Sequence, residues 1–161
     1  MMDVLDVARF FLSKSVPGTS EAITPLKLQK LIYYALAYYL AFDYDGRNHE
    51  QLLFDDTIEA WTHGPVCKKV YSVYSKGHNR FEELPAEAPL EAVDDNIKKL
   101  LDCVWVTYGK FSGSQLEEFT HMEAPWQNAR RRAGDEVWER SNEPIDISDM
   151  RCFYKEKLEL Q

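Results

Sequence analysis

A long segment that loses all charge towards its end constrains the fold more than any other feature. Thr24–Phe42 reads TPLKLQKLIYYALAYYLAF, without a charged residue from Leu31 onwards. Thr24 can cap a helix through its hydroxyl, and Pro25 suits the first helical position, where no N–H is needed. Apolar side chains recur at helical spacing and finally cover all faces of the segment. The uncharged run is shorter than the ~20 residues that span a bilayer, so we predict a buried central helix.

Composition narrows the class of protein. The chain has 161 residues, of which 45% are hydrophobic and 13% aromatic, as is typical of a globular domain. A net charge of −8 repels nucleic acid and anionic lipid, so neither is an expected partner. The N-terminal segment MMDVLDVARFFLSK lacks the pattern of a signal peptide, and three cysteines without a CxxC pair indicate free thiols. We therefore expect one domain over residues 1–161, in the cytoplasm.

Six further segments carry apolar residues at helical spacing. Glycines and prolines mark several of their ends, and two serines offer caps, Ser114 (with Glu117 at capping-box spacing) and Ser148. The predicted helices run from Val4 to Leu12, from Pro65 to Gly77, from Val93 to Tyr108, from Ser114 to Phe119, from Pro125 to Gly134, and from Ser148 to Leu158.

Strand signals are few. Thr57, Ile58 and Trp61 favour a strand after a turn-like pair of aspartates, and Ile145 and Ile147 alternate with acids. We therefore predict a mainly α fold: a single compact helical domain of about six or seven helices around the buried central helix, with at most a small β-hairpin or sheet.

Two kinds of chemical site can be considered around His63. His63 and Cys67 lie four residues apart, and His121 with Glu123 could complete a metal shell, but the close ligand pairs typical of zinc sites are missing. Pro65 also separates the first two. A structural histidine and a buried thiol explain these residues more simply, so we predict no metal site.

Enzyme and cofactor signals are equally sparse. Cys67 paired with His63 or His121 has the residue types of a nucleophile and base, but no glycine-rich turn presents the thiol. Acid–base chemistry near His121 would use Glu117, Glu118 and Glu123, which a solvated helix face explains as well. The chain contains no GxGxxG, GxxxxGK[ST], GxSxG or HExxH, so no cofactor and no catalytic residue is predicted.

Arginines and aromatic residues suggest binding roles. Arg130, Arg131 and Arg132 with Arg140 form the one dense basic patch, but three consecutive arginines fan around a helix and better compensate its C-terminal dipole. Four tryptophans and nine tyrosines exceed the needs of a core this size. Aromatic residues dominate binding hot spots, although core filling remains the alternative for each of Trp61, Tyr71, Trp126 and Trp138.

Three segments together resemble a known family. They are KLQKLIYYA at Lys27–Ala35, EAWTHGPVCKKVY at Glu59–Tyr71, and YGKFSGSQLEEFTHMEAPWQNAR at Tyr108–Arg130. With the closing helical tail, their order and spacing extend from about Val4 to Leu158. The chain is similar to the Panacea antitoxin domain family, a SocA-like group that includes phage GepA-like proteins.

The resemblance implies a mostly helical, non-enzymatic antitoxin that neutralises a cognate protein toxin by direct contact. One branch of the family instead acts as a proteolytic adaptor, which would add a Clp-type protease as a partner. Some members carry a DNA-binding segment, but this sequence shows no helix-turn-helix extension and no basic arm. We favour the antitoxin, keep the adaptor as the alternative and rank a small hydrolase last. The toxin's identity and the oligomeric state are left open.

The resemblance assigns no catalytic role to the motif residues and implies that most of them build the fold. These residues are Lys27, Gln29, Lys30, Trp61, His63, Gly64, Pro65, Thr120, His121, Glu123, Pro125 and Trp126. Among the motif and aromatic residues, we predict the following to bind the partner: Trp61, His63, Pro65, Tyr71, His121 and Trp126.

Overall fold

A central helix organises the protein. The structure, a computed structural model, describes residues 1–134 and 141–160. Helix α2 spans Pro25–Phe42, and all of its residues except Tyr39 and Phe42 are buried. The Thr24 side chain accepts a hydrogen bond from the Lys27 backbone N–H, and Pro25 takes the first position, as predicted. The prediction of a buried central helix is confirmed.

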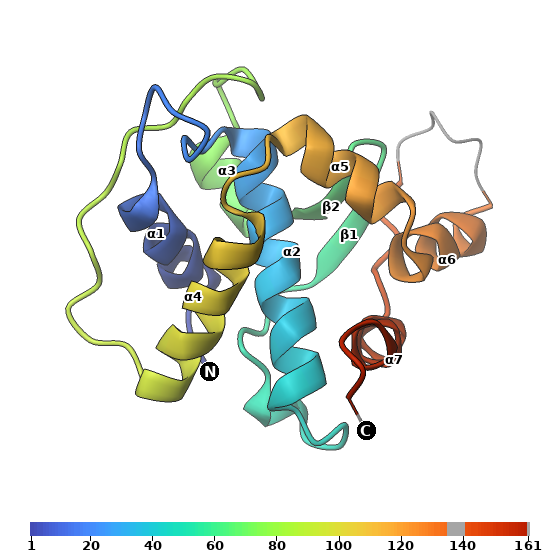
Figure 1. Cartoon of the computed structure of the whole chain (residues 1–161). Helices are drawn as coiled ribbons and strands as arrows, with labels where there is room; N and C mark the ends of the chain where they lie inside the picture. Colours follow the sequence, from blue (N-terminus) through green and yellow to red (C-terminus); the bar gives the residue numbers. More distant parts are fainter. Residues whose placement is uncertain (135–140, 161) are drawn as a thin grey trace.

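The other helices pack around α2 (Figure 1). They are α1 (Val4–Lys14), α3 (Lys68–Tyr74), α4 (Asp95–Tyr108), α5 (Gly113–His121), α6 (Ala124–Arg132), α7 (Ile147–Lys157) and the 3₁₀ helix His49–Gln51. Helices α1 and α4 lie on one side of α2, while α6 and α7 lie on the other. The mainly α prediction is confirmed. Within the described ranges, no helix has the length and apolar content needed to cross a membrane.

A small antiparallel hairpin is the main β element. Strand β1 (Ile58–Trp61) pairs with β2 (Gly64–Cys67), with Ile58 opposite Cys67 and Trp61 opposite Gly64. Residues 143–145 extend along the other edge of β1, because the Ala60 N–H donates to the Glu143 carbonyl (2.9 Å) and the Ile145 N–H to the Ile58 carbonyl (2.8 Å). The strand prediction at Ile58 is thus confirmed. Near Ile145 the structure has an isolated β-bridge between Pro144 and Glu59 instead of a strand, and Ile147 begins α7.

The predicted helix start at Pro65 is wrong. Pro65 lies inside β2, and the helix begins three residues later at Lys68. Alternate residues of a strand turn their backbone polar groups to opposite edges, and at Pro65 and Cys67 these groups face α2 rather than β1. The missing N–H of Pro65 therefore removes no ladder hydrogen bond, and pairing with β1 overrides the local helical preference.

Two predicted caps are displaced by two residues. The capping box of α5 uses Ser112 and Gln115 rather than Ser114 and Glu117. Helix α7 is capped by Asp146, whose carboxylate accepts the backbone N–H groups of Ser148 and Asp149. Because a carboxylate caps a helix at least as well as a hydroxyl does, the acid before Ser148 takes this role.

Candidate functional site

The hairpin is docked on α2 by the side chain of Gln29. Its Nε2 donates to the Cys67 carbonyl (3.2 Å), and its Oε1 accepts from the Cys67 N–H (2.9 Å). One amide thus completes both backbone groups of a strand residue, which requires a donor and an acceptor on the same side chain. We call the hairpin, together with the side chains that hold it (Gln29, Lys30, His121, Trp126 and Arg130), the hairpin latch.

Lys30 is the second member of the hairpin latch. It is fully buried, and its Nζ donates to the Pro65 carbonyl at 3.1 Å. Burial lowers the pKa of Lys30 to about 7, with the Glu117 carboxylate acting in the opposite direction. Gly64 has φ +100°, and a Cβ there would lie 2.8 Å from Lys30 Cε and 3.0 Å from Thr120 Oγ1. The hairpin turn can therefore approach α2 this closely only because residue 64 is glycine.

Helix α6 holds β1 from the opposite side. Trp126 Nε1 donates to the Trp61 carbonyl (3.0 Å), and Arg130 Nη1 donates to the Ala60 carbonyl (3.0 Å). The His121 ring stacks on Trp126 with a centroid distance of 4.2 Å. Burial lowers the pKa of His121, which favours the neutral imidazole at pH 7. These contacts give Trp126 and His121 a structural role in the hairpin latch.

His63 lies at the exposed tip of the hairpin. Its Nδ1 is 2.8 Å from Glu117 Oε1, and its Nε2 is 2.7 Å from Arg80 Nη1. The imidazole thus bridges α5 and the loop after α3. Both ring nitrogens already have partners, so His63 is held in place rather than presented as a free base.

Glu123 is only two residues from His121, but its carboxylate contacts tyrosines of α2 and α7 and not the histidines. Its carboxylate accepts hydrogen bonds from Tyr33 (2.8 Å) and Tyr154 (2.7 Å), and Lys157 Nζ lies 3.7 Å away. Burial raises the pKa of Glu123, while the two tyrosine hydroxyls act against this rise. The contacts of Glu123 fasten α7 to α2 and the start of α6.

The nucleophile considered from the sequence, Cys67, is not presented as a reactive thiol. Cys67 is buried in β2 and its pKa is raised by burial, so the thiolate is disfavoured. Its backbone, rather than its sulfur, carries the contacts to Gln29. A search of the described residues found no group of three or more His, Cys, Asp or Glu side chains arranged to hold a metal ion.

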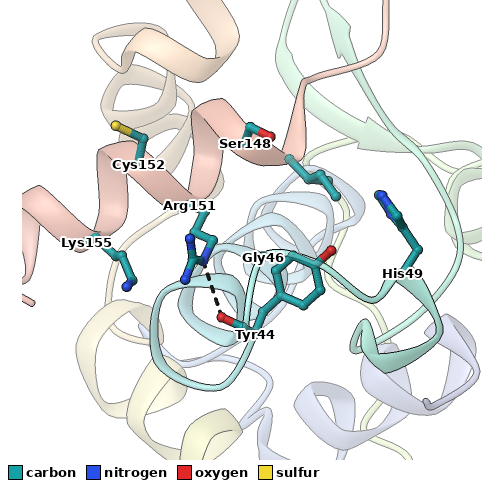
Figure 2. A pocket seen from close by; sticks show the side chains of 8 residues that line it. Tyr44, Gly46, His49, Ser148, Arg151, Cys152 and Lys155 are labelled. Atoms are coloured by element: carbon teal, nitrogen blue, oxygen red, sulfur yellow. Dashed lines mark hydrogen bonds between the residues drawn. The ribbon is translucent and has the colours of Figure 1, made fainter. Parts of the chain in front are cut away.

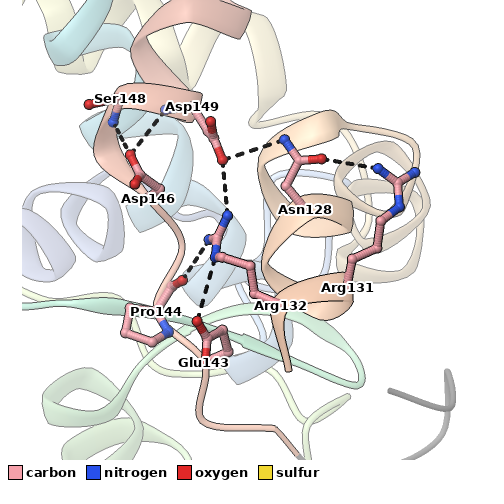
Figure 3. Close-up of polar contacts among 8 residues, drawn as sticks. All are labelled: Asn128, Arg131, Arg132, Glu143, Pro144, Asp146, Ser148 and Asp149. Atoms are coloured by element: carbon pink, nitrogen blue, oxygen red, sulfur yellow. Dashed lines mark hydrogen bonds and ion pairs between the residues drawn. The ribbon is translucent and has the colours of Figure 1, made fainter. Parts of the chain in front are cut away.

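The arginines of α6 point in different directions, as predicted, and Figure 3 shows Arg131 and Arg132 on different sides of the helix. Arg130 is buried against the hairpin, whereas Arg131 is exposed and donates to Asn128 of the same helix. Arg132 contacts both α7 and the segment before it. Its Nη1 lies 3.2 Å from Asp149 Oδ2, its Nη2 donates to the Pro144 carbonyl (3.1 Å), and its Nε lies 3.5 Å from Glu143 Oε1. Arg140, the fourth predicted member of this patch, lies outside the described residues.

The predicted partner-binding residues differ in exposure. Pro65 and Trp126 are buried, Trp61 and His121 are half-buried, and His63 and Tyr71 are exposed. The Trp61 and Tyr71 rings are in contact, with centroids 5.1 Å apart. Trp138, the remaining candidate aromatic residue, lies outside the described ranges.

Sequence reasoning placed Lys27, Gln29 and Lys30 in a motif without finding what they bind. The Lys27 ammonium is also buried, donates to the Ser20 and Gly109 carbonyls, and has its pKa lowered to about 8 by burial. The signal that could have revealed this role is the presence of two lysines and a glutamine on a helix that is buried on all sides. Such residues must find polar partners, because buried amides and ammonium groups are costly when unpaired.

Comparison with known proteins identifies one family. Residues 28–127, well over half of the chain, match the family model described as antitoxin SocA-like, Panacea domain. Searches of curated proteins and of solved structures found no match. The matched range extends from α2 into α6 and contains both strands of the hairpin.

Proposed function

Because the chain belongs to the SocA-like antitoxin family with the Panacea domain, we propose that it neutralises a cognate protein toxin by direct contact. Family membership is the observation that carries this proposal, and it favours a non-enzymatic role. The contacts of His63, Cys67, His121 and Glu123 agree with that role, because each is engaged in holding the fold. The free thiols at Cys67, Cys103 and Cys152 support a reducing cytoplasm as the place of action.

The proposed toxin-binding surface combines the exposed tip of the hairpin with α3 and the loop that follows α3. We call it the hairpin face; its residues are Trp61, His63, Tyr71, Val73, Arg80 and Phe81. Trp61 packs on Tyr71, His63 pairs with Arg80, and the Arg80 guanidinium lies 4.8 Å from the Phe81 ring centroid, while Val73 is an exposed apolar residue of α3. Exposed aromatic and arginine side chains on a rigid support are typical of binding hot spots.

Co-expression with the native toxin tests both the function and the surface. The wild-type chain should restore growth and form a stoichiometric complex detectable by native mass spectrometry. The double substitution Trp61→Ala and Tyr71→Ala should weaken the complex at least about tenfold, with Val106→Ala on the exposed face of α4 as the matched control. Toxicity that persists with the wild-type chain would overturn the antitoxin function. Full neutralisation by the folded double variant would overturn only the surface.

The toxin's half-life separates inhibition from delivery to a protease. In the proposed mechanism, the toxin stays bound and its half-life in cells is unchanged or longer when this protein is present. A half-life that shortens only in cells with an active Clp-type protease would instead establish the adaptor mechanism.

A further inference from the structure

Charge is segregated along the chain at the hairpin face. Residues 62–81 contain four lysines and arginines and no acid, whereas residues 82–95 contain six acids and no lysine or arginine. The first of these stretches runs from the tip of the hairpin through α3 into the loop that follows. In a chain of net charge −8, a stretch with only basic charged residues indicates that the partner presents acidic groups to it.

Two of these four cations have no carboxylate partner. Lys68 and Lys69 lie 3.5 Å and 3.0 Å from carboxylates of other elements, so their charge is compensated within the molecule. The exposed side chain of Lys76 makes no hydrogen bond or ion pair with any residue that the structure describes. Arg80 contacts His63 rather than an acid. The positive charge available to a partner is therefore that of Lys76 and Arg80.

The Arg80 guanidinium is held in position at the hairpin tip. Its Nη1 donates to His63 Nε2 (2.7 Å), and its Cζ lies 4.8 Å from the Phe81 ring centroid. The backbone is held as well, because the Arg80 carbonyl accepts from the Leu26 N–H (3.2 Å) and Asn79 Oδ1 accepts from the Phe81 N–H (2.8 Å). A side chain that is ordered before binding loses less entropy when a partner docks.

The contact with His63 leaves one edge of the Arg80 guanidinium open. His63 Nδ1 lies 2.8 Å from Glu117 Oε1, so the tautomer protonated at Nδ1 donates to that carboxylate and accepts from Arg80 at Nε2. The imidazole thus separates the guanidinium from the acid. Within the described residues, Nε and Nη2 of Arg80 have no partner. Their parallel N–H groups match the two oxygens of a carboxylate.

Arg151 shows the contrast (Figure 2). It lines a pocket at the other end of α2, but its Nε donates to the Tyr44 carbonyl (3.3 Å), so one donor of the same edge is already used. Arg132 uses its Nε, Nη1 and Nη2 within the molecule. Arg80 differs from both, because it is held through Nη1 alone and offers the other edge to a partner.

The surroundings of Arg80 favour a protein partner over a nucleic acid. Phe81 is 57% exposed and Tyr71 is 40% exposed, and Tyr71 packs on Trp61 next to the hairpin tip. These rings offer apolar surface to side chains of a protein. A nucleic acid would instead bring a row of phosphates close to the acids of residues 82–95, which repel them.

We propose that Arg80 determines the specificity of the hairpin face, by binding the carboxylate of an aspartate or glutamate that lies among apolar residues of the toxin. Lys76 adds attraction at longer range. The inference rests on the proposed antitoxin function and names the chemical group that this surface recognises.

Charge reversal tests the proposal in cells that express the native toxin. Arg80→Glu should abolish neutralisation and weaken the purified complex at least about thirtyfold, because two carboxylates then face each other. Arg80→Lys keeps the charge but loses the two-donor edge, so it should weaken the complex about tenfold. The matched control is Arg131→Glu at an exposed arginine of α6, which should neutralise the toxin as the wild type does.

A compensating charge on the toxin identifies the group that Arg80 binds. Each acid of the toxin is replaced by lysine in turn, and the variants that remain toxic are expressed with Arg80→Glu. One of them should be neutralised by Arg80→Glu and poorly by the wild type, an exchange that a purely structural role of Arg80 does not produce. Neutralisation by Arg80→Glu equal to that by the wild type, or no compensating position among the toxic variants, would overturn the proposal.

Lys76→Glu keeps the proposal testable if Arg80→Glu does not fold, since the Lys76 side chain has no contact within the described residues to lose. It should slow association with the toxin about threefold at low salt, whereas Lys98→Glu, at an exposed lysine of α4, should not. Equal association rates for these two variants would contradict the proposal.

Two further outcomes separate this inference from the antitoxin function. If the wild type retarded a DNA duplex and Arg80→Glu lost only that activity, the surface would belong to a nucleic acid and the proposal would be overturned. If the wild type did not neutralise the toxin at all, the antitoxin function would fall and this inference with it. Neutralisation by the wild type without dependence on Arg80 or Lys76 would overturn this inference alone.

Discussion

Glycine is required at position 64 for two reasons, the backbone conformation and the lack of space for a Cβ. Its φ of +100° disfavours any side chain, and a Cβ would also press on Lys30 and Thr120. Gly77 has a similar φ of +84° but no atom within 4 Å of its Cβ position, so it isolates the backbone cost. We expect Gly77→Ala to lower the free energy of unfolding by about 1–2 kcal/mol, and Gly64→Ala by at least about 3 kcal/mol. Urea denaturation measures both, and equal losses would show that the close approach to α2 adds nothing.

The buried Lys30 predicts how stability depends on pH. In the unfolded chain its pKa is near 10.5, whereas in the folded protein it is about 7. Between these values the unfolded state binds more protons, so the contribution of Lys30 to stability rises with pH. We expect the free energy of unfolding of the wild type, relative to Lys30→Met, to increase by about 2 kcal/mol from pH 7 to pH 9.

The control for this experiment is Lys98→Met, which removes an exposed lysine of α4. Its difference from the wild type should stay flat over the same range. Since His121 has its pKa lowered from 6.5, it titrates below this range, and it is present in every variant. If the difference in unfolding free energy between the wild type and Lys30→Met did not change with pH, the lowered pKa of the buried Lys30 would be contradicted.

At the scale of elements, one arginine joins α6 to α7. Arg132 contacts Asp149, Glu143 and the Pro144 carbonyl. Its neighbour Arg131 has a side-chain hydrogen bond to Asn128 of its own helix, and among the described residues none to α7 (Figure 3). We expect Arg132→Met to lower the free energy of unfolding by only about 1 kcal/mol, because the charges that it contacts are partly exposed. Arg131→Met should lower it by less than about 0.5 kcal/mol. Hydrogen exchange should show faster opening of residues 143–150 in the first variant alone. Matching exchange in both variants would exclude this connection.

At the scale of the whole molecule, α2 should make unfolding cooperative. It packs against α1, α3, α4, α5, α7 and β2, so no large group of helices can separate without exposing it. We expect calorimetry to give one transition over residues 1–161, with an enthalpy of about 110 kcal/mol near 60 °C. Leu36→Ala in α2 and Met150→Ala in α7 should each shift that single transition. Two separable transitions would contradict the prediction of one domain.

The hairpin shows which features of the fold can be predicted from neighbouring residues and which cannot. Ile58 and Trp61 were recognisable as strand residues from their side chains alone, because β preference is partly local. Pro65 was misassigned since its environment is set by β1 and α2, not by its neighbours in the chain. The displaced caps at Ser112 and Asp146 are smaller errors of the same kind, in which one of several adjacent polar residues takes the role.

The sequence by itself determined the helices, their approximate ends, the buried central helix and the family, because hydrophobic periodicity, capping residues and motifs depend on residues that are close together in the chain. Only the tertiary structure decided what the polar residues of α2 do. Gln29 and Lys30 reach backbone groups 38 and 35 residues away, and Arg151 donates to the Tyr44 carbonyl across 107 positions. Such pairings depend on how whole elements pack, and a buried donor reveals only that it needs a partner, not which one.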